Sequence, residues 1–157
     1  MLGDREHMQE WYRRAGEYHH SFYLPYLKLA KAAHAAADFE TARELYEKAL
    51  DCLLRMPEKD ADIFLGATYT NLTSCLTMLH RYPAAEQAWK QAQRYPRPAG
   101  SAATASILYA AMGDAERCAR YLELLKAEQA AMYGQAETMA RQILRGEHPA
   151  FPPRTQI

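Results

Sequence analysis

The sequence predicts an all-α protein, and three observations support this fold class. The first is composition: among 157 residues there is no valine and there are only four isoleucines, whereas alanine, leucine and glutamate abound. Strands favour β-branched residues, and helices favour the second group. The second is the spacing of apolar residues, which recur three and four positions apart between clusters of glycine and proline. The third is an internal repeat, described below.

Eight helices are expected in order along the chain, because stretches of about 12–20 residues with helical apolar spacing lie between breakers. The breakers are Pro25, Pro57, Pro83, Pro96, Pro98, Gly113, Gly134 and the segment from Gly146 to Pro153. The predicted helices span residues 4–21, 24–36, 39–55, 60–80, 83–94, 99–112, 115–129 and 132–145. Residues 146–157 hold three prolines, which predict an extended Pro-rich tail.

The first of these helices, over residues 4–21, carries a clear apolar face. Met8, Trp11, Ala15 and Tyr18 follow one another at helical spacing. A single amphipathic helix cannot bury such a stripe by itself, so it must pack against other helices. The segment is therefore expected to dock on the helices that follow it.

Length and charge limit the kinds of protein that this chain can be. A chain of 157 residues fits one domain. Nineteen basic side chains balance nineteen acidic ones, whereas nucleic-acid proteins carry a clear basic excess. No apolar run approaches the roughly 20 residues of a membrane helix, and the polar first ten residues do not resemble a signal peptide. We therefore expect a cytoplasmic protein with no nucleic-acid or membrane partner.

The three cysteines, Cys52, Cys75 and Cys118, are odd in number and far apart, with no Cys-x-x-Cys pair. A disulfide framework or a structural zinc site would need more cysteines or closer spacing. Free buried thiols in a reducing compartment are the simplest interpretation. A redox-active thiol is the alternative, although no cluster of basic residues surrounds any of the three.

Three segments of the chain share one pattern of large, small and apolar positions. Each begins with a helix that carries a small residue, passes through a turn, and continues into a helix that carries a second small residue and a large apolar one. The first small residues are Ala30, Thr73 and Ser106, the second are Ala42, Ala85 and Cys118, and the large ones include Tyr26, Tyr69, Tyr46 and Trp89. Small side chains allow two helices to cross closely, and large ones fill the gaps between neighbouring helices.

This pattern resembles the tetratricopeptide repeat (TPR) family, whose unit is a helix–turn–helix of about 34 residues. The segment from Ala37 to Leu50 is close to the family pattern for the turn and second helix, and Gly113-Asp114 and Pro96 match their positions. The resemblance implies a right-handed α-solenoid of about three repeats, roughly residues 23–56, 66–98 and 99–131. Helices 4–21 and 132–145 are expected to cap its two ends, as such arrays require.

The repeats are not evenly spaced. Ala42 and Ala85 are 43 residues apart, whereas Ala85 and Cys118 are 33 residues apart. The first interval is therefore about nine residues longer than the family's unit, and the extra residues lie between Met56 and Phe64. We expect them to lengthen a helix or to add a loop.

Charge is also distributed unevenly along the chain. Eight acids and four bases lie between Asp38 and Asp62, whereas Glu86 is the only acid between Ile63 and Tyr109. These charges either lie on the solvated outer faces of the second helices or promote association with another copy or a charged partner.

Repeats of this family generally hold a peptide along the concave face formed by their first helices, and the resemblance implies the same here. The concave positions are small and weakly polar, with two lysines at one end. The candidate partner-binding residues are Leu27, Lys28, Lys31, His34, Thr70, Asn71, Ser74, Met78, Thr104 and Ile107. An extended peptide would bind there through hydrogen bonds and apolar contacts. Alternatively, the first helix or the Pro-rich tail fills this groove.

No catalytic, metal or cofactor motif accompanies the repeats. The sequence has no HExxH, phosphate-binding loop, nucleophile elbow or dinucleotide fingerprint. It holds one Glu-x-x-His unit, Glu17 to His20, where a di-metal bundle needs two. We therefore expect a non-catalytic module, without a cofactor, that binds an unknown protein or peptide as an adaptor or chaperone-like scaffold. A homo-oligomer and a sensor for a small peptide or metabolite are the alternatives.

Overall fold

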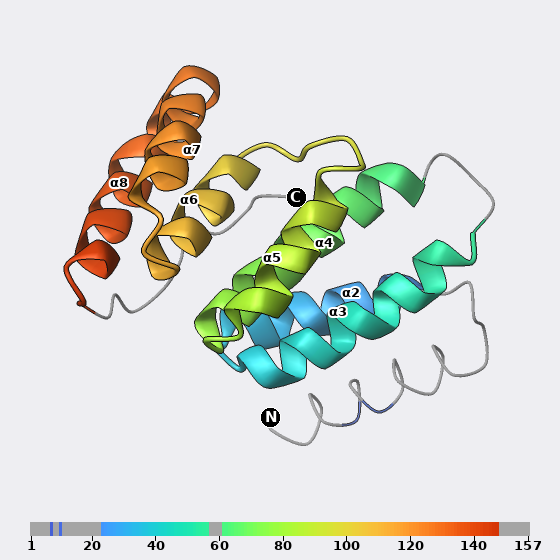
Figure 1. Cartoon of the computed structure of the whole chain (residues 1–157). Coiled ribbons are helices and arrows are strands. Elements are labelled where there is room, and N and C mark those ends of the chain that lie inside the picture. The colour runs from blue at the N-terminus through green and yellow to red at the C-terminus, as the bar shows by residue number, and fades with distance from the viewer. Residues whose placement is uncertain (1–6, 8–9, 11–22, 57–60, 148–157) are drawn as a thin grey trace.

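The computed structural model describes residues 7, 10, 23–56 and 61–147, and this part of the chain contains seven helices and no strand (Figure 1). The all-α prediction is confirmed. The helices are α2 (Tyr23–Ala35), α3 (Phe39–Leu54), α4 (Ala61–Met78), α5 (Tyr82–Ala92), α6 (Ser101–Ala111), α7 (Ala115–Glu128) and α8 (Ala130–Leu144). Their ends agree closely with the predicted ones. The predicted helix 4–21 and most of the predicted tail lie outside the described residues.

The described part of the extra segment between the first two repeats lengthens a helix, and residues 57–60 lie outside the described residues. Helix α4 begins at Ala61 and runs for 18 residues, compared with 13 in α2 and 11 in α6. It carries only two charged or strongly polar side chains, Asp62 and Asn71, and most of it is buried. None of the described helices has the length and apolar character that a membrane span requires.

The helices form successive hairpins. Helix α2 packs against α3, α4 against α5, and α6 against α7. The hairpins are joined by contacts of α3 with α4 and of α4 with α6, and α8 then packs against both α6 and α7. Figure 1 shows this order in space, with α6, α7 and α8 as one group beside the α4–α5 hairpin and with the α2–α3 hairpin on the other side of α4.

The turn inside each hairpin has the same backbone geometry. One residue adopts a left-handed conformation, and this residue is Ala37, His80 or Gly113, with φ of 60°, 58° and 76°. The N–H of the following residue donates to the carbonyl oxygen five residues before it, at 2.8 or 2.9 Å. This hydrogen bond satisfies a carbonyl group that the end of the first helix leaves unpaired. The three turns are therefore structurally equivalent although only one of them contains glycine.

Because alanine is strained in the left-handed region, Ala37→Gly is expected to stabilise the protein by about 0.5–1 kcal/mol. The gain is the relieved backbone strain minus the larger entropy of glycine in the unfolded chain. Gly113→Ala is the matched reverse change, because a Cβ added there would meet no atom within 4 Å and so tests the backbone alone. Urea denaturation measures both free energies of unfolding. If both substitutions raised the free energy of unfolding, or both lowered it, the expected equivalence of the two turns would be contradicted.

The small residues of the repeat are all buried between the helices. Ala30, Thr73 and Ser106 on the first helices are fully buried, as are Ala42 and Ala85 on the second helices. Cys118 occupies the corresponding position of the third hairpin and is also buried. Larger side chains at these places would force the helices apart. The rings of Tyr46 and Trp89 fill neighbouring space in the core, as the pattern predicts.

Helix α6 is the most enclosed helix of the described part. All ten residues from Ser101 to Ala110 are buried. Helices α4, α5, α7 and α8 all contact α6, so it has no face directed to solvent. A helix that is apolar all round is typical of such a central position.

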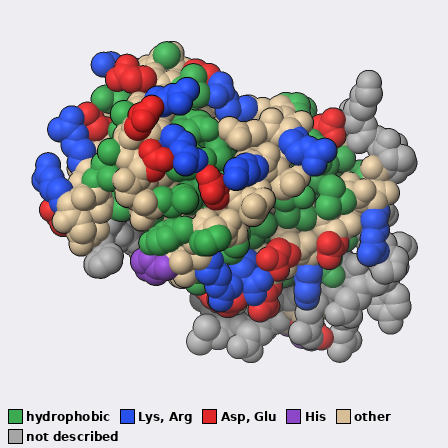
Figure 2. Space-filling view, in the orientation of Figure 1, with side chains coloured by type: hydrophobic (Ala, Val, Ile, Leu, Met, Phe, Trp, Pro, Cys, Tyr) green, Lys and Arg blue, Asp and Glu red, His purple; other side chains and the backbone are tan. Residues whose placement is uncertain are grey.

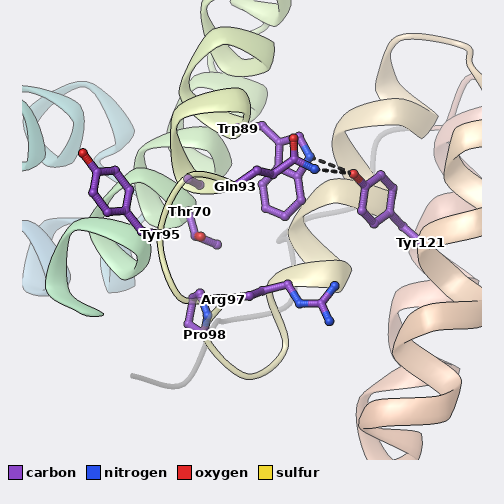
Figure 3. Close-up of a pocket in the computed structure, with 8 residues that line it drawn as sticks. Thr70, Trp89, Gln93, Tyr95, Arg97, Pro98 and Tyr121 are labelled. Atoms are coloured by element: carbon purple, nitrogen blue, oxygen red, sulfur yellow. Dashed lines mark hydrogen bonds between the residues drawn. The ribbon is translucent and has the colours of Figure 1, made fainter. Parts of the chain in front are cut away.

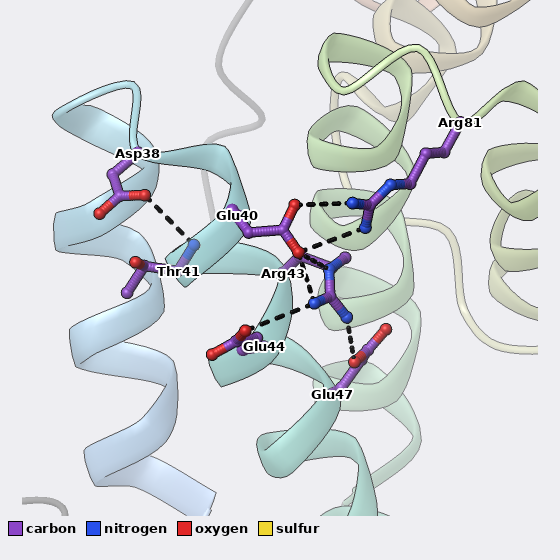
Figure 4. A network of polar contacts seen from close by, with 7 residues as sticks. All are labelled: Asp38, Glu40, Thr41, Arg43, Glu44, Glu47 and Arg81. Carbon is purple, nitrogen blue, oxygen red and sulfur yellow. Dashed lines mark hydrogen bonds and ion pairs between the residues drawn. The ribbon is translucent and has the colours of Figure 1, made fainter.

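Ion pairs connect the second helices of successive hairpins. Glu40 on α3 pairs with Arg81 before α5 at 3.0 Å, and Glu86 on α5 pairs with Arg117 on α7 at 2.9 Å. Figure 4 shows that Glu40 also accepts hydrogen bonds from Arg43, and these bonds lower the pKa of the Glu40 carboxyl group. Acids and bases of the unevenly charged stretches thus pair within one chain. Figure 2 shows positive and negative side chains beside one another across this face.

Candidate functional site

The predicted concave surface is only partly exposed. Lys28 and Lys31 are exposed, and His34 and Met78 are half-buried. The other six predicted residues are at most 6% exposed, so the expectation that they line an open groove is wrong in this respect. These six are Leu27, Thr70, Asn71, Ser74, Thr104 and Ile107.

The buried apolar members of this set belong to the core. Leu27 on α2 and Ile107 on α6 are part of the same cluster of buried side chains. Thr104 and Ile107 lie on α6, which four other helices surround. The sequence marked α6 as the concave helix of its repeat, but the packing of α8 against it removes its open side.

The threonines of α4 use their hydroxyl groups within their own helix. The hydroxyl group of Thr70 donates to the carbonyl oxygen of Gly66 at 2.8 Å, and that of Thr77 donates in the same way to Thr73. A threonine bonded to the preceding turn can be buried as a small apolar residue. This explains why a weakly polar stripe in the sequence corresponds to a buried surface in the structure.

Asn71 and Ser74 lie one turn apart on α4, and each is 5% exposed. Within the described part of the chain, the Ser74 hydroxyl oxygen has no hydrogen-bond partner. A buried hydroxyl group without a partner costs free energy, but the Ser74 oxygen is itself buried, so a ligand does not reach it in this arrangement of the helices. That Asn71 and Ser74 contact a partner stays a prediction.

His34 contacts the core between α2, α3 and α4. Its Nδ1 atom lies 3.3 Å from the Tyr46 hydroxyl oxygen and 3.7 Å from the Cys75 sulfur. Its ring meets the rings of Phe39 and Tyr46 edge to face. His34 is therefore held by packing contacts that the sequence did not reveal.

Two of the predicted residues do come together, at an apolar cavity of about 330 Å³ that we call the Met78 cavity. Met78 ends α4, Ile107 belongs to α6, and Ile143 comes from α8. The remaining lining residues are Thr77, His80, Tyr82, Ala111, Gly146 and Glu147. At its edge, the Tyr82 hydroxyl group and Nδ1 of His80 lie 2.7 Å apart, within hydrogen-bonding distance. The cavity thus joins two hairpins and the last helix.

A second cavity, of about 380 Å³, was not expected from the sequence (Figure 3). We call it the Trp89 cavity. It lies between the end of α5, the segment 93–100 and α7, and its lining residues are Thr70, Trp89, Ala92, Gln93, Tyr95, Arg97, Pro98 and Tyr121. The sequence predicted that Trp89 lies in the core and that Pro96 closes a repeat. No sequence pattern indicated that this region lies beside Tyr121.

The Tyr121 side chain is held firmly beside this cavity. Its hydroxyl oxygen accepts hydrogen bonds from Nε1 of Trp89 at 3.1 Å and from Nε2 of Gln93 at 2.9 Å (Figure 3). Its ring stacks on Tyr109 with the centroids 5.6 Å apart, and it meets the Trp89 ring edge to face. These contacts place Tyr121 in a single orientation.

The three cysteines are free and buried, as predicted. Burial raises the pKa of all three thiols, and that of Cys75 reaches about 12. A thiol with a raised pKa is a poor nucleophile at neutral pH. Among the residues of known placement, no three His, Cys, Asp or Glu side chains gather as a metal site would require.

The sequence matches no family model, no curated protein and no solved structure.

Proposed function

We propose that this chain is a non-catalytic, tetratricopeptide-like solenoid that binds a peptide segment of a partner protein at the Met78 cavity. Three equivalent hairpins support this proposal, together with the contacts of α3 with α4, of α4 with α6 and of α6 with α8. In a solenoid each unit contacts only its neighbours, as these contacts do. In this proposal, helix α8 is the C-terminal capping helix of the solenoid.

The Met78 cavity is the observation that carries this proposal. It is the place where predicted binding residues from two hairpins, Met78 and Ile107, line one common space. Its volume of about 330 Å³ is at the lower end of the range for ligand pockets. Methionine adapts its shape to different apolar side chains, which suits a peptide-binding surface. An apolar anchor residue of the peptide would enter the cavity, with the peptide backbone across its mouth.

Selection from a displayed library of random peptides tests this function. Peptides enriched on the wild-type protein are expected to bind Met78→Glu at least about tenfold more weakly, because a carboxylate in the wall of the cavity would oppose an apolar anchor. The matched control is Ile63→Glu, also on α4, where the side chain is 63% exposed and outside both cavities. Isothermal titration calorimetry measures both affinities.

Failure to enrich any peptide, or equal loss in the Met78→Glu and Ile63→Glu variants, would contradict the assignment. A dilution series on a sizing column identifies the alternative occupant. Dissociation of a wild-type dimer on dilution, with a monomeric Met78→Glu variant, would assign the cavity to a second copy of the chain instead.

A further inference from the structure

The Trp89 cavity shares no lining residue with the Met78 cavity, so it can be considered independently of the proposed peptide site. Its volume of about 380 Å³ is that of a pocket for a small ligand. Three aromatic side chains and a proline form much of its wall, and polar groups from Gln93, Arg97 and Tyr121 reach it. Apolar walls with a few convergent polar groups are typical of small-molecule sites.

The hydrogen bonds of Tyr121 determine which kind of polar group the cavity can receive. A phenol oxygen has two lone pairs and one proton. Trp89 and Gln93 both donate to this oxygen, so its acceptor capacity is used. Because Gln93 presents its Nε2 rather than its Oε1 to Tyr121, the Tyr121 proton is directed away from both donors. Since Tyr121 lines the cavity, its hydroxyl group is available as a hydrogen-bond donor to a bound ligand.

The charged side chains at the cavity wall also favour a ligand with a hydrogen-bond acceptor, in particular an anion. Arg97 lines the cavity, and the segment from Gln93 to Gly100 contains Arg94 and Arg97 but no acid. Arg97 forms an ion pair with Glu128, in which both side chains are more than two-fifths exposed. The guanidinium group has five N–H donors, so it can bind a second carboxylate as well. No carboxylate is among the lining residues, and the charge of Glu128 is already paired with Arg97.

The aromatic walls are fixed before any ligand binds. Tyr95 stacks on Tyr69 with the ring planes 11° apart, and Tyr121 stacks on Tyr109 at 7°. Trp89 is almost fully buried, and its Nε1 atom is bonded to Tyr121. A site with immobile walls loses little conformational entropy on binding. Flat walls of this kind favour a flat apolar ligand.

From these observations we propose that the Trp89 cavity binds a small aromatic carboxylate. The ligand carboxylate accepts hydrogen bonds from the Tyr121 hydroxyl group and from Arg97, and the ligand ring packs against Trp89 and Pro98. Phenylacetate has the charge, the ring and a size suited to the cavity, and phenylacetamide is its neutral analogue.

Fluorescence of Trp89 tests the proposal directly. The chain has two tryptophans, so Trp11→Phe leaves Trp89 as the only one. In this background, phenylacetate at millimolar concentrations is expected to change the emission in a saturable way. Phenylacetamide is expected to bind at least about tenfold more weakly, since bonds to a charged acceptor are about twice as strong as those to a neutral one.

Two variants and one control identify the groups responsible. Tyr121→Phe removes the hydroxyl group and keeps the ring, and Arg97→Gln removes the exposed charge, so each is expected to weaken phenylacetate binding about tenfold. Arg94→Gln is the control, because Arg94 is exposed and bonded to Gln91 outside the cavity. The Arg94→Gln variant should bind phenylacetate with the same affinity as the Trp11→Phe protein from which it is made. Thermal melting confirms that each variant is folded.

The proposal is overturned if phenylacetate, benzoate and indole-3-acetate all fail to saturate, if the amide binds as tightly as the acid, or if Arg97→Gln and Arg94→Gln behave alike. Peptides that bind the Met78 cavity should not compete with phenylacetate. A variant that loses phenylacetate binding but keeps peptide binding, or the reverse, would show that this site and the proposed peptide site are separate.

Discussion

Above pH 9 the free energy of unfolding is expected to fall by about 1.4 kcal/mol for each pH unit because of Cys75 alone. Burial raises the pKa of this thiol from 9.0 to about 12. Below pH 9 the thiol is protonated in both states, so its contribution to stability is complete. Between pH 9 and 12 the unfolded chain loses the proton and the folded protein keeps it, so rising pH favours unfolding. Burial also raises the pKa of Tyr46, which acts in the same direction above pH 10.

Urea denaturation at pH 7, 9, 10 and 11 under reducing conditions measures this effect in the wild type and in Cys75→Ala. The variant loses stability at pH 7 because it leaves space in the core, but its curve should fall less steeply above pH 9. The difference between the two proteins should therefore shrink as the pH rises. Cys52→Ala is the matched control and should have a smaller effect on the slope, because Arg55 opposes the shift at Cys52. Parallel curves for wild type and Cys75→Ala would show that Cys75 titrates normally.

Gly66→Ala is expected to destabilise the protein by about 1–3 kcal/mol, although alanine is the better helix former. A Cβ added at Gly66 would lie 2.5 Å from the carbonyl oxygen of Pro96 and 3.2 Å from Cβ of Tyr95. The nearest of these atoms belongs to the backbone, so the segment that follows α5 would have to move as a whole. Gly66 thus allows this segment to pass close to α4.

The control is Gly134→Ala in α8, where a new Cβ would meet no atom within 4 Å. This change is expected to stabilise the protein by up to about 1 kcal/mol, which is the ordinary helix propensity difference. Urea denaturation should therefore show a lower free energy of unfolding for Gly66→Ala and a higher one for Gly134→Ala. Because Tyr95, Arg97 and Pro98 form a wall of the Trp89 cavity, Gly66→Ala should also weaken phenylacetate binding. If Gly66→Ala were more stable than the wild type, the segment that follows α5 would be able to move away from α4 at little cost in free energy.

The helices and their turns could be predicted because they depend on neighbouring residues. Apolar spacing indicates which residues form a helix, and Gly113-Asp114 indicates a turn. The turns at Ala37 and His80 lack glycine, so alignment of the three repeats was needed to show that they are equivalent to the turn at Gly113. The burial of the small repeat residues could also be predicted, since small side chains are expected where two helices pack together.

The exposed surface could not be predicted in the same way. Repeat register assigned Thr104 and Ile107 to an open face, but α8 packs against α6 and both residues are buried. The hydroxyl group of Thr70 was expected to be available to a partner, yet it donates to a carbonyl group of its own helix. Exposure depends on which distant elements cover a helix, and repeat register does not contain that information.

By itself, the sequence determined an all-helical chain, the approximate ends of its helices, and the alanine-sized contacts between them. These features follow from local hydrogen bonding and side-chain size. Only the tertiary structure decided where cavities form and which polar groups face them. Trp89, Arg97 and Tyr121 meet because separate segments fold against one another, and the contacts of Trp89 and Gln93 with the Tyr121 hydroxyl group form only when these segments are in place.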